Sequence, residues 1–282
     1  MHGWGKILFC AWILCWGCFS ETPLRYWRVD ISFDETVLGL GLDKEQLRRT
    51  LRERMRQASA FKEEAGGGRA SVVAWEILLD EHWENANAVL VMAFKFGRNS
   101  ETVWRLQKES WFQTPIHALS PKEVYTEADV LARELLRDGE TLWKASQQSD
   151  RRLLQELRQP MSPMRFAALQ VLSSRKNGDV FPELLKELQS KEIGRVRRAV
   201  GFLVELRDER AAPALAELFL RQGPLLRQEV LYAVAAVGGE NAKAFLFTVA
   251  QGEDDEHLAL QAKALLGELE GAGKKRFPVV VP

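Results

Sequence analysis

FLVELRDERAAPAL, residues 202–215, recurs in outline at a regular interval along the C-terminal half of the chain. VLSSRKNGDVFPEL begins at Val171 and AVAAVGGENAKAFL begins at Ala233, so the three stretches start at equal intervals before and after Phe202. We call this interval the repeat period. Each copy has the pattern of one amphipathic helix ending, a polar turn, and a second helix beginning. A single helix pair cannot bury its apolar face alone, so the repeat predicts an array of stacked helix pairs.

The same spacing sets the limits of this array. The second helices of two units match, since LLQELRQ begins at Leu153 and LLKELQS begins at Leu184. The following units have a leucine at the same position, Leu215 and Leu246. Three complete units flanked by two half units cover about residues 140–271. We therefore predict a helical repeat region over residues 149–271. The positions that mark the first helix of each unit are Leu172, Leu203, Val234 and Leu266.

VRRAVGFLVELRDERAAPAL, residues 196–215, resembles the repeat unit of the HEAT-repeat family in its short, bacterial-type form. The family's arginine positions correspond to Arg165, Arg197 and Arg227, which we interpret as braces of the stack, with contact to a ligand as the alternative. Its turn aspartate corresponds to Asp208, with Asn177 and Gly239 in the neighbouring units. The resemblance covers less than half of the chain. It implies an α-solenoid that presents a curved surface to a protein partner, and it implies no particular reaction.

The N-terminal half has a different pattern. Residues 27–33 alternate apolar and polar side chains, which is typical of a strand with one buried face. Residues 43–58 place Leu47, Leu51 and Met55 on one face of a helix, and three further strands are predicted at about residues 71–82, 85–98 and 101–112. The order β-α-β-β-β predicts an α+β domain over residues 24–115.

A connecting segment, residues 120–148, follows this domain. Ser120 and Pro121 suit the N-cap and the first position of a helix that we expect over residues 121–148. Asp138 and Gly139 mark a point at which this helix is expected to kink or split.

Residues 1–20 have the features of a secretory signal, because Lys6 precedes an apolar run too short to span a bilayer comfortably. Two endings are open. Gly17 and Cys18 resemble the end of a bacterial lipobox, in which Cys18 becomes lipidated, although Cys15 stands where that motif normally has leucine. Alternatively, the chain is cut after Ser20. Both endings predict export to the cell envelope, either as a membrane-anchored lipoprotein or as a periplasmic protein. The remaining alternative is an uncleaved anchor or a cytoplasmic protein.

No familiar motif for a reaction is present. The chain has 39 basic and 39 acidic residues, so nothing in its net charge favours nucleic acid as a partner. It has no P-loop, no G-x-S-x-G elbow and no HExxH, and EDDEH at residues 253–257 reads as a polar turn. We therefore predict a non-enzymatic protein without a cofactor, a metal site or catalytic residues.

The second helix of each unit supplies the predicted partner surface. Residues beside its apolar face form two rows across the units, and these are Gln155, Lys186, Glu217 and Thr248 in one row and Glu156, Glu187, Leu218 and Val249 in the other. The favoured function is a protein-interaction scaffold or adaptor in the cell envelope. The alternatives are a cell-wall glycan-binding protein that uses an exposed tryptophan such as Trp83, and a HEAT-like enzyme or enzyme subunit related in architecture to lyases.

The last residues, 272–282, are expected to form an extended tail. KKRFPVVVP, residues 274–282, contains Pro278, which cannot continue a helix, and three valines that favour an extended chain. Three roles are open for this tail. It covers the open end of the repeats, it adds as a strand to a partner or to this protein's own sheet, or it is disordered.

Overall fold

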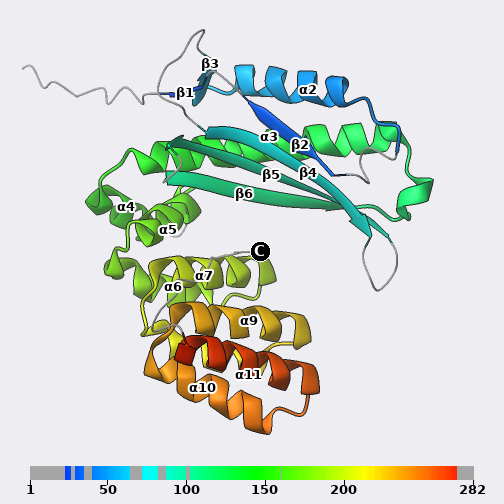
Figure 1. Cartoon of the computed structure of the whole chain (residues 1–282). Coiled ribbons are helices and arrows are strands. Elements are labelled where there is room, and N and C mark those ends of the chain that lie inside the picture. The colour runs from blue at the N-terminus through cyan, green and yellow to red at the C-terminus, as the bar shows by residue number, and fades with distance from the viewer. Residues whose placement is uncertain are drawn as a thin grey trace, which may run out of the picture.

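The structure is a computed structural model that describes residues 23–26, 29–34, 40–63, 72–81, 87–99, 102–159 and 161–271. The predicted signal segment with Cys18, the hairpin residue Trp83 and the tail at 272–282 lie outside the described residues. The described part consists of an N-terminal sheet region followed by helices, which confirms the predicted succession of α+β and helical regions in this coarse form (Figure 1).

A four-stranded sheet forms the upper part of the molecule (Figure 1). Its strand order is β2-β4-β5-β6, in which β2 runs parallel to β4 and the other neighbours are antiparallel. Two short strands that the sequence pattern did not predict, β1 and β3, form a separate parallel pair. The strands are β1 (Leu24–Tyr26), β2 (Asp30–Phe33), β3 (Phe61–Glu63), β4 (Val72–Glu81), β5 (Ala88–Asn99) and β6 (Thr102–Trp111).

One face of the sheet is buried beneath two helices, α2 (Lys44–Gln57) and α3 (Pro121–Ser146). Trp75 of β4 stacks on Phe94 of β5 with ring centroids 4.5 Å apart, and its indole N–H points to the sulfur of Met55 in α2 at 3.3 Å. Leu47, Leu51 and Met55 are all buried, as the helical pattern of residues 43–58 predicts.

Helix α3 connects the sheet to the helices that follow. Ser120 caps it through a capping box with Glu123, so the predicted start of the helix is confirmed. The predicted interruption at Asp138 and Gly139 is wrong, because the helix is continuous to Ser146. A Cβ at Gly139 would lie 3.1 Å from the Phe94 ring and 3.3 Å from the Phe61 ring, so glycine lets α3 approach these rings more closely than a residue with a side chain would without a small shift.

The helices after α3 pack in two layers (Figure 1). Helices α3, α5, α7, α9 and α11 pack side by side in that order and form the first layer. In the second layer α8 packs beside α10, and α4 and α6 pack against α5 and α7 of the first layer. A 3-10 turn (Ile116–Ala118) precedes α3 and another (Gly178–Val180) precedes α6. The remaining helices are α4 (Asp150–Leu157), α5 (Arg165–Ser174), α6 (Phe181–Glu187), α7 (Ile193–Leu206), α8 (Ala211–Arg221), α9 (Pro224–Val237), α10 (Gly239–Gly252) and α11 (Glu256–Gly271).

The repeat period is also visible in the structure. Leu153, Leu184, Leu215 and Leu246, which follow one another at this period, have no exposed surface. The turns follow the same period, since Lys176, Arg207 and Gly238 all have positive φ angles, of 58°, 55° and 76°. Each of these residues follows the first helix of its unit, where a left-handed residue commonly ends a helix. A residue just after the first helix of each unit thus has a positive φ angle, but the turns are not identical, because ψ is 41° at Arg207 and −160° at Gly238.

The buried side chains form one continuous cluster, from Leu24 in β1 to Leu265 in α11. Helix α3 joins its two halves, because it packs on β5 and β6 and also on α5. The boundary predicted at residue 115 thus lies between a strand and a helix, and the one predicted at residue 149 lies between the helices α3 and α4, in both cases without a break in the core.

Candidate functional site

Two of the three brace arginines lie partly buried within the repeats. Arg165 of α5 binds Glu183 and Glu187 of α6, at 3.0 and 3.1 Å. Arg227 of α9 binds Glu253, just after α10, through two hydrogen bonds of 3.0 and 2.7 Å. Each of these ion pairs joins the first helix of a unit to the second helix of the same unit, so it braces the unit internally. Arg165 also donates a hydrogen bond of 2.5 Å to the Leu157 carbonyl at the end of α4, in the preceding unit.

Arg197 lies one residue after the position that the repeat period predicts from Arg165 and Arg227. It is more exposed and pairs with Glu229 at 2.9 Å, so it links two neighbouring helices of the first layer, α7 and α9. This contact is also structural.

The predicted partner rows divide between surface and interior. Gln155, Lys186, Glu217 and Thr248 are all exposed, as predicted, and their role in binding stays a prediction. The second row is wrong as an accessible surface. Each member of this row follows a member of the first row by one residue, so its side chain points about 100° further around the helix. That direction faces the neighbouring helices. Glu187, Leu218 and Val249 are buried, and Glu156 is half-buried and accepts a hydrogen bond from Ser162.

The first layer carries exposed apolar side chains that the sequence prediction missed. Tyr232 of α9 is 53% exposed and Leu260 of α11 is 60% exposed. Tyr232 lies between the buried Val230 and Val234, about 200° around the helix from Val230, so it points away from the second layer. Leu260 has the same relation to the buried Leu258 and Ala262. Because α9 and α11 are neighbours, both side chains lie on one face.

Arg198 and Glu205 of α7 extend this face. The Arg198 guanidinium lies 4.3 Å from the centroid of the Phe166 ring, and its burial lowers its pKa although Asp138 opposes that change. Burial raises the pKa of Glu205, against the effect of Lys176. Neither side chain forms an ion pair within the described part of the chain. We call Arg198, Glu205, Tyr232 and Leu260 the first-layer face.

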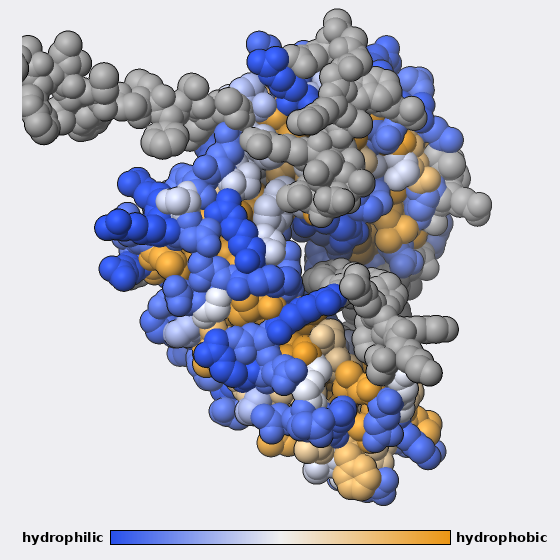
Figure 2. Space-filling model, turned by 60° about the vertical axis from the view of Figure 1, so that its left-hand side comes forward, coloured by the Kyte–Doolittle hydropathy of each residue, from blue (hydrophilic) through white to orange (hydrophobic). Residues whose placement is uncertain are grey.

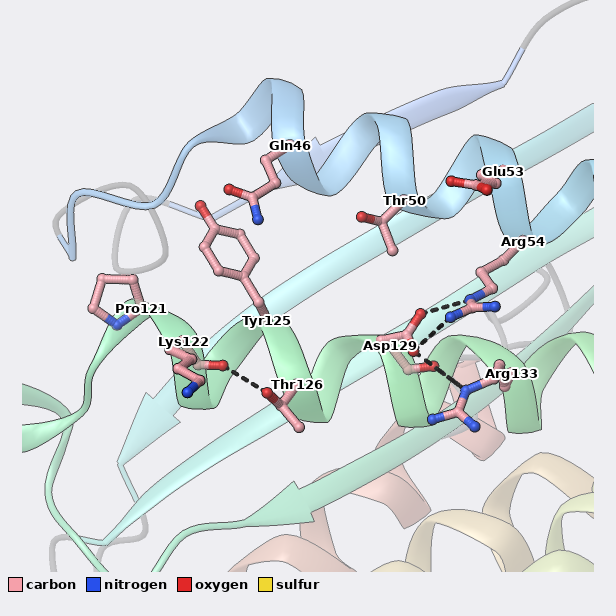
Figure 3. Close-up of a pocket in the computed structure, with 10 residues that line it drawn as sticks. All are labelled: Gln46, Thr50, Glu53, Arg54, Pro121, Lys122, Tyr125, Thr126, Asp129 and Arg133. Atoms are coloured by element: carbon pink, nitrogen blue, oxygen red, sulfur yellow. Dashed lines mark hydrogen bonds and ion pairs between the residues drawn. The ribbon is translucent and has the colours of Figure 1, made fainter.

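A polar groove of about 720 Å³ separates α2 from α3 (Figure 3). Asp129 of α3 accepts two hydrogen bonds from Arg54 of α2, at 2.7 and 3.0 Å, and lies 3.3 Å from Arg133. The hydrogen bonds to Asp129 raise the pKa of Arg54. The ion pair of Arg54 with Asp129 spans the groove, so it holds the two helices together.

The second face of the sheet carries Trp111, which is 49% exposed, and the exposed Leu78. The described tryptophans Trp75, Trp104 and Trp143 are instead buried in the core. Trp111 is therefore the described aromatic residue best placed to stack on a ligand in this region.

Within the described ranges, no group of three or more His, Cys, Asp or Glu side chains is placed to hold a metal ion. Asp255 of the EDDEH segment accepts hydrogen bonds from the N–H groups of His257 and Leu258 at the start of α11, as the interpretation of this segment as a turn suggests. None of the described helices is long and apolar enough to cross a membrane. Comparisons with family models, with curated proteins and with solved structures found no match.

Proposed function

We propose that this protein is an exported adaptor of the cell envelope, held at the membrane by its N-terminal segment. In this proposal the repeats form a HEAT-like α-solenoid whose first-layer face binds a protein partner. The periodic burial and the periodic positive φ angles support the solenoid. The signal-like pattern of residues 1–20 supports export.

The chemistry of the first-layer face carries the proposal. Protein interfaces are enriched in tyrosine and arginine, and the residues that dominate binding energy lie at their apolar centres. Tyr232 and Leu260 provide an apolar centre on adjacent helices, and Arg198 and Glu205 are charges without an ion pair among the described residues. A partner that contacts all four side chains can pair these charges while it covers the apolar surface.

Replacing Tyr232 with alanine and Leu260 with serine should remove partner binding without unfolding the repeats. Both side chains are largely exposed, so the effect on stability should stay within about 0.5 kcal/mol. Truncation of central interface residues costs roughly 2 kcal/mol or more, which corresponds to a loss of affinity of about thirtyfold. The measurement is recovery of cross-linked partners from cells that contain the full chain, by quantitative mass spectrometry.

Matched variants separate this face from the other surfaces. Leu220→Ser alters a 75% exposed leucine on α8 and should leave recovery unchanged. Glu217→Ala tests the predicted row on the second layer. A loss with Glu217→Ala and none with the Tyr232 and Leu260 variants would move the binding surface to the second layer. A loss of binding to cell-wall glycan with Trp111→Ala would favour the glycan-binding alternative, which the exposure of Trp111 supports.

The membrane attachment is tested at Cys18. Cys18→Ala should move the protein from the membrane fraction to the soluble fraction, or leave its signal segment uncut, because the proposed lipid is attached to this sulfur. The N-terminal mass of the mature chain and a blot for its C-terminal half measure both results. A soluble cytoplasmic product that keeps Met1 in the unaltered protein would contradict the envelope location.

A further inference from the structure

The end of the stack formed by α10 and α11 has a side with no neighbouring described helix. Phe245 of α10 faces the preceding helix α8, because its ring meets Phe219 with centroids 5.4 Å apart. Phe247 lies about 200° around α10 from Phe245, so it points to the opposite side, where a further unit would pack. Phe247 is 58% exposed. Apolar side chains reach the surface at the lower end of the molecule, where Figure 1 shows these helices (Figure 2).

Helix α11 contributes to the same side. Arg197 of α7 shows which side of a first-layer helix faces the next helix, since it pairs with Glu229 of α9. Leu203 and Leu266 are equivalent in the repeat, so Leu260 corresponds to Arg197 and borders this side of α11 as well as the first-layer face. Ala259 and Leu266 lie about 100° or more around the helix from Leu260 and are half-buried, although the structure describes no helix after α11. We call Phe247, Ala259 and Leu266, with the half-buried Ala250, the open end.

The C-terminus of α11 lies close to the open end. Only residues 253–255 separate α10 from α11, and the two helices pack against each other, so the last turn of α11 lies beside the first turns of α10. The hydrogen bond to Glu240, and to a smaller extent the charge of Glu270 in that last turn, raise the pKa of Lys243. Lys243 therefore lies near the last turn of α11, and Phe247 is one helical turn, about 6 Å, further along α10. The described part of the chain ends at Gly271 in this last turn, and residues 272–282 follow in the sequence.

We propose that residues 274–282 of this chain cover the open end and shield it from water. The link from Gly271 to Phe277 is long enough to span up to about 20 Å, so Phe277 can reach Phe247. Phe277 and Val279 to Val281 supply apolar surface, and Pro278 keeps the segment from continuing the helix. A second copy or another protein has to compete with a segment that is tethered at high effective concentration.

Covering the open end has a consequence for assembly. Repeat arrays need a terminal element with a polar outer face to stay soluble, because an uncovered terminal unit presents the surface on which the next unit stacks. Lys274, Lys275 and Arg276 can supply that polar face beside Glu270. The segment thus sets the length of the array and leaves the first-layer face as the surface for a partner.

The test compares three full-length variants with the unaltered protein: deletion of residues 277–282, Phe277→Ser, and Phe247→Ser. Amide hydrogen exchange is read by mass spectrometry, and sedimentation gives the state of assembly. We expect all three changes to speed exchange in α10 and α11 by roughly tenfold or more, because shielding raises the free energy of local opening. Exchange in α2 and α3 should not change. The deletion should also promote concentration-dependent association.

Three results would overturn the proposal. Unchanged exchange in α10 and α11 after the deletion would show that the segment does not cover them. A protein that sediments as a dimer and loses the dimer with Phe247→Ser, but not with the deletion, would show that a second copy covers the open end. Unchanged exchange together with a loss of partner recovery after the deletion would show that the segment binds a partner.

Discussion

Leu215→Ala is expected to lower the free energy of unfolding by roughly 2–5 kcal/mol, the range for truncating a fully buried leucine. Leu215 has no exposed surface and lies at the position in the second layer that recurs with every unit of the array. In an array of repeats, stability depends mainly on contacts between neighbouring units. Hydrogen exchange should therefore rise first in α7 to α10 and later in the sheet.

The matched control for Leu215 is Leu220→Ala on the same helix. Leu220 is 75% exposed, so its replacement should change stability by no more than about 0.5 kcal/mol. Urea denaturation followed by circular dichroism measures both variants. A change below about 0.5 kcal/mol for Leu215→Ala would mean that the register of the repeats is wrong.

Glu187→Ala is expected to cost roughly 3 kcal/mol or more, since it removes one partner of a buried ion pair. Glu187 is 2% exposed and accepts from two arginines, Arg165 at 3.1 Å and Arg195 at 2.7 Å. Without the carboxylate, the Arg165 guanidinium stays largely buried with only Glu183 as an acidic partner among the described residues. Arg195 is more exposed and can be solvated, so the cost should fall near the lower end of the range for buried pairs.

Two further variants define the cause of this loss. Glu217→Ala removes an exposed carboxylate one unit away, 3.9 Å from Arg221, and should have an effect below about 0.5 kcal/mol. Arg165→Met combined with Glu187→Leu should recover part of the lost stability, because apolar side chains of similar volume can replace a buried pair. Equal losses for Glu187→Ala and Glu217→Ala would contradict the proposed brace.

Periodicity made much of this fold predictable from sequence. The buried leucines that recur at the repeat period and the alternating residues of β4 and β5 both arise from burial, which fixes the residue type at each position. The strands β1 and β3 escaped prediction because such short strands are too brief to show an alternating pattern. Asp138-Gly139 was misread as an interruption, since a glycine packed closely against the rings of Phe94 and Phe61 looks the same in sequence as one that ends a helix.

The surface was harder to predict for a physical reason. Consecutive side chains on a helix point about 100° apart. Glu187, Leu218 and Val249 therefore lie in the interior, although the residue before each of them is exposed. Tyr232 and Leu260 were missed because an apolar residue in an amphipathic helix is normally counted with the core. Alignment of the units could have identified Tyr232, since it corresponds to Gly201 in the preceding unit and not to a buried leucine.

Site-specific photo-cross-linking from the first-layer face tests the proposed adaptor function most directly. A photoreactive residue is placed at position 232 or 260 in the full chain, and at positions 217 and 220 as controls, in cells at native expression. We expect one discrete cross-linked protein from positions 232 and 260, absent at the controls and lost when Arg198 is also replaced by alanine. Cross-links from position 217 alone, or none from 232 and 260 while the protein is folded and exported, would contradict the claim that this face binds a protein partner.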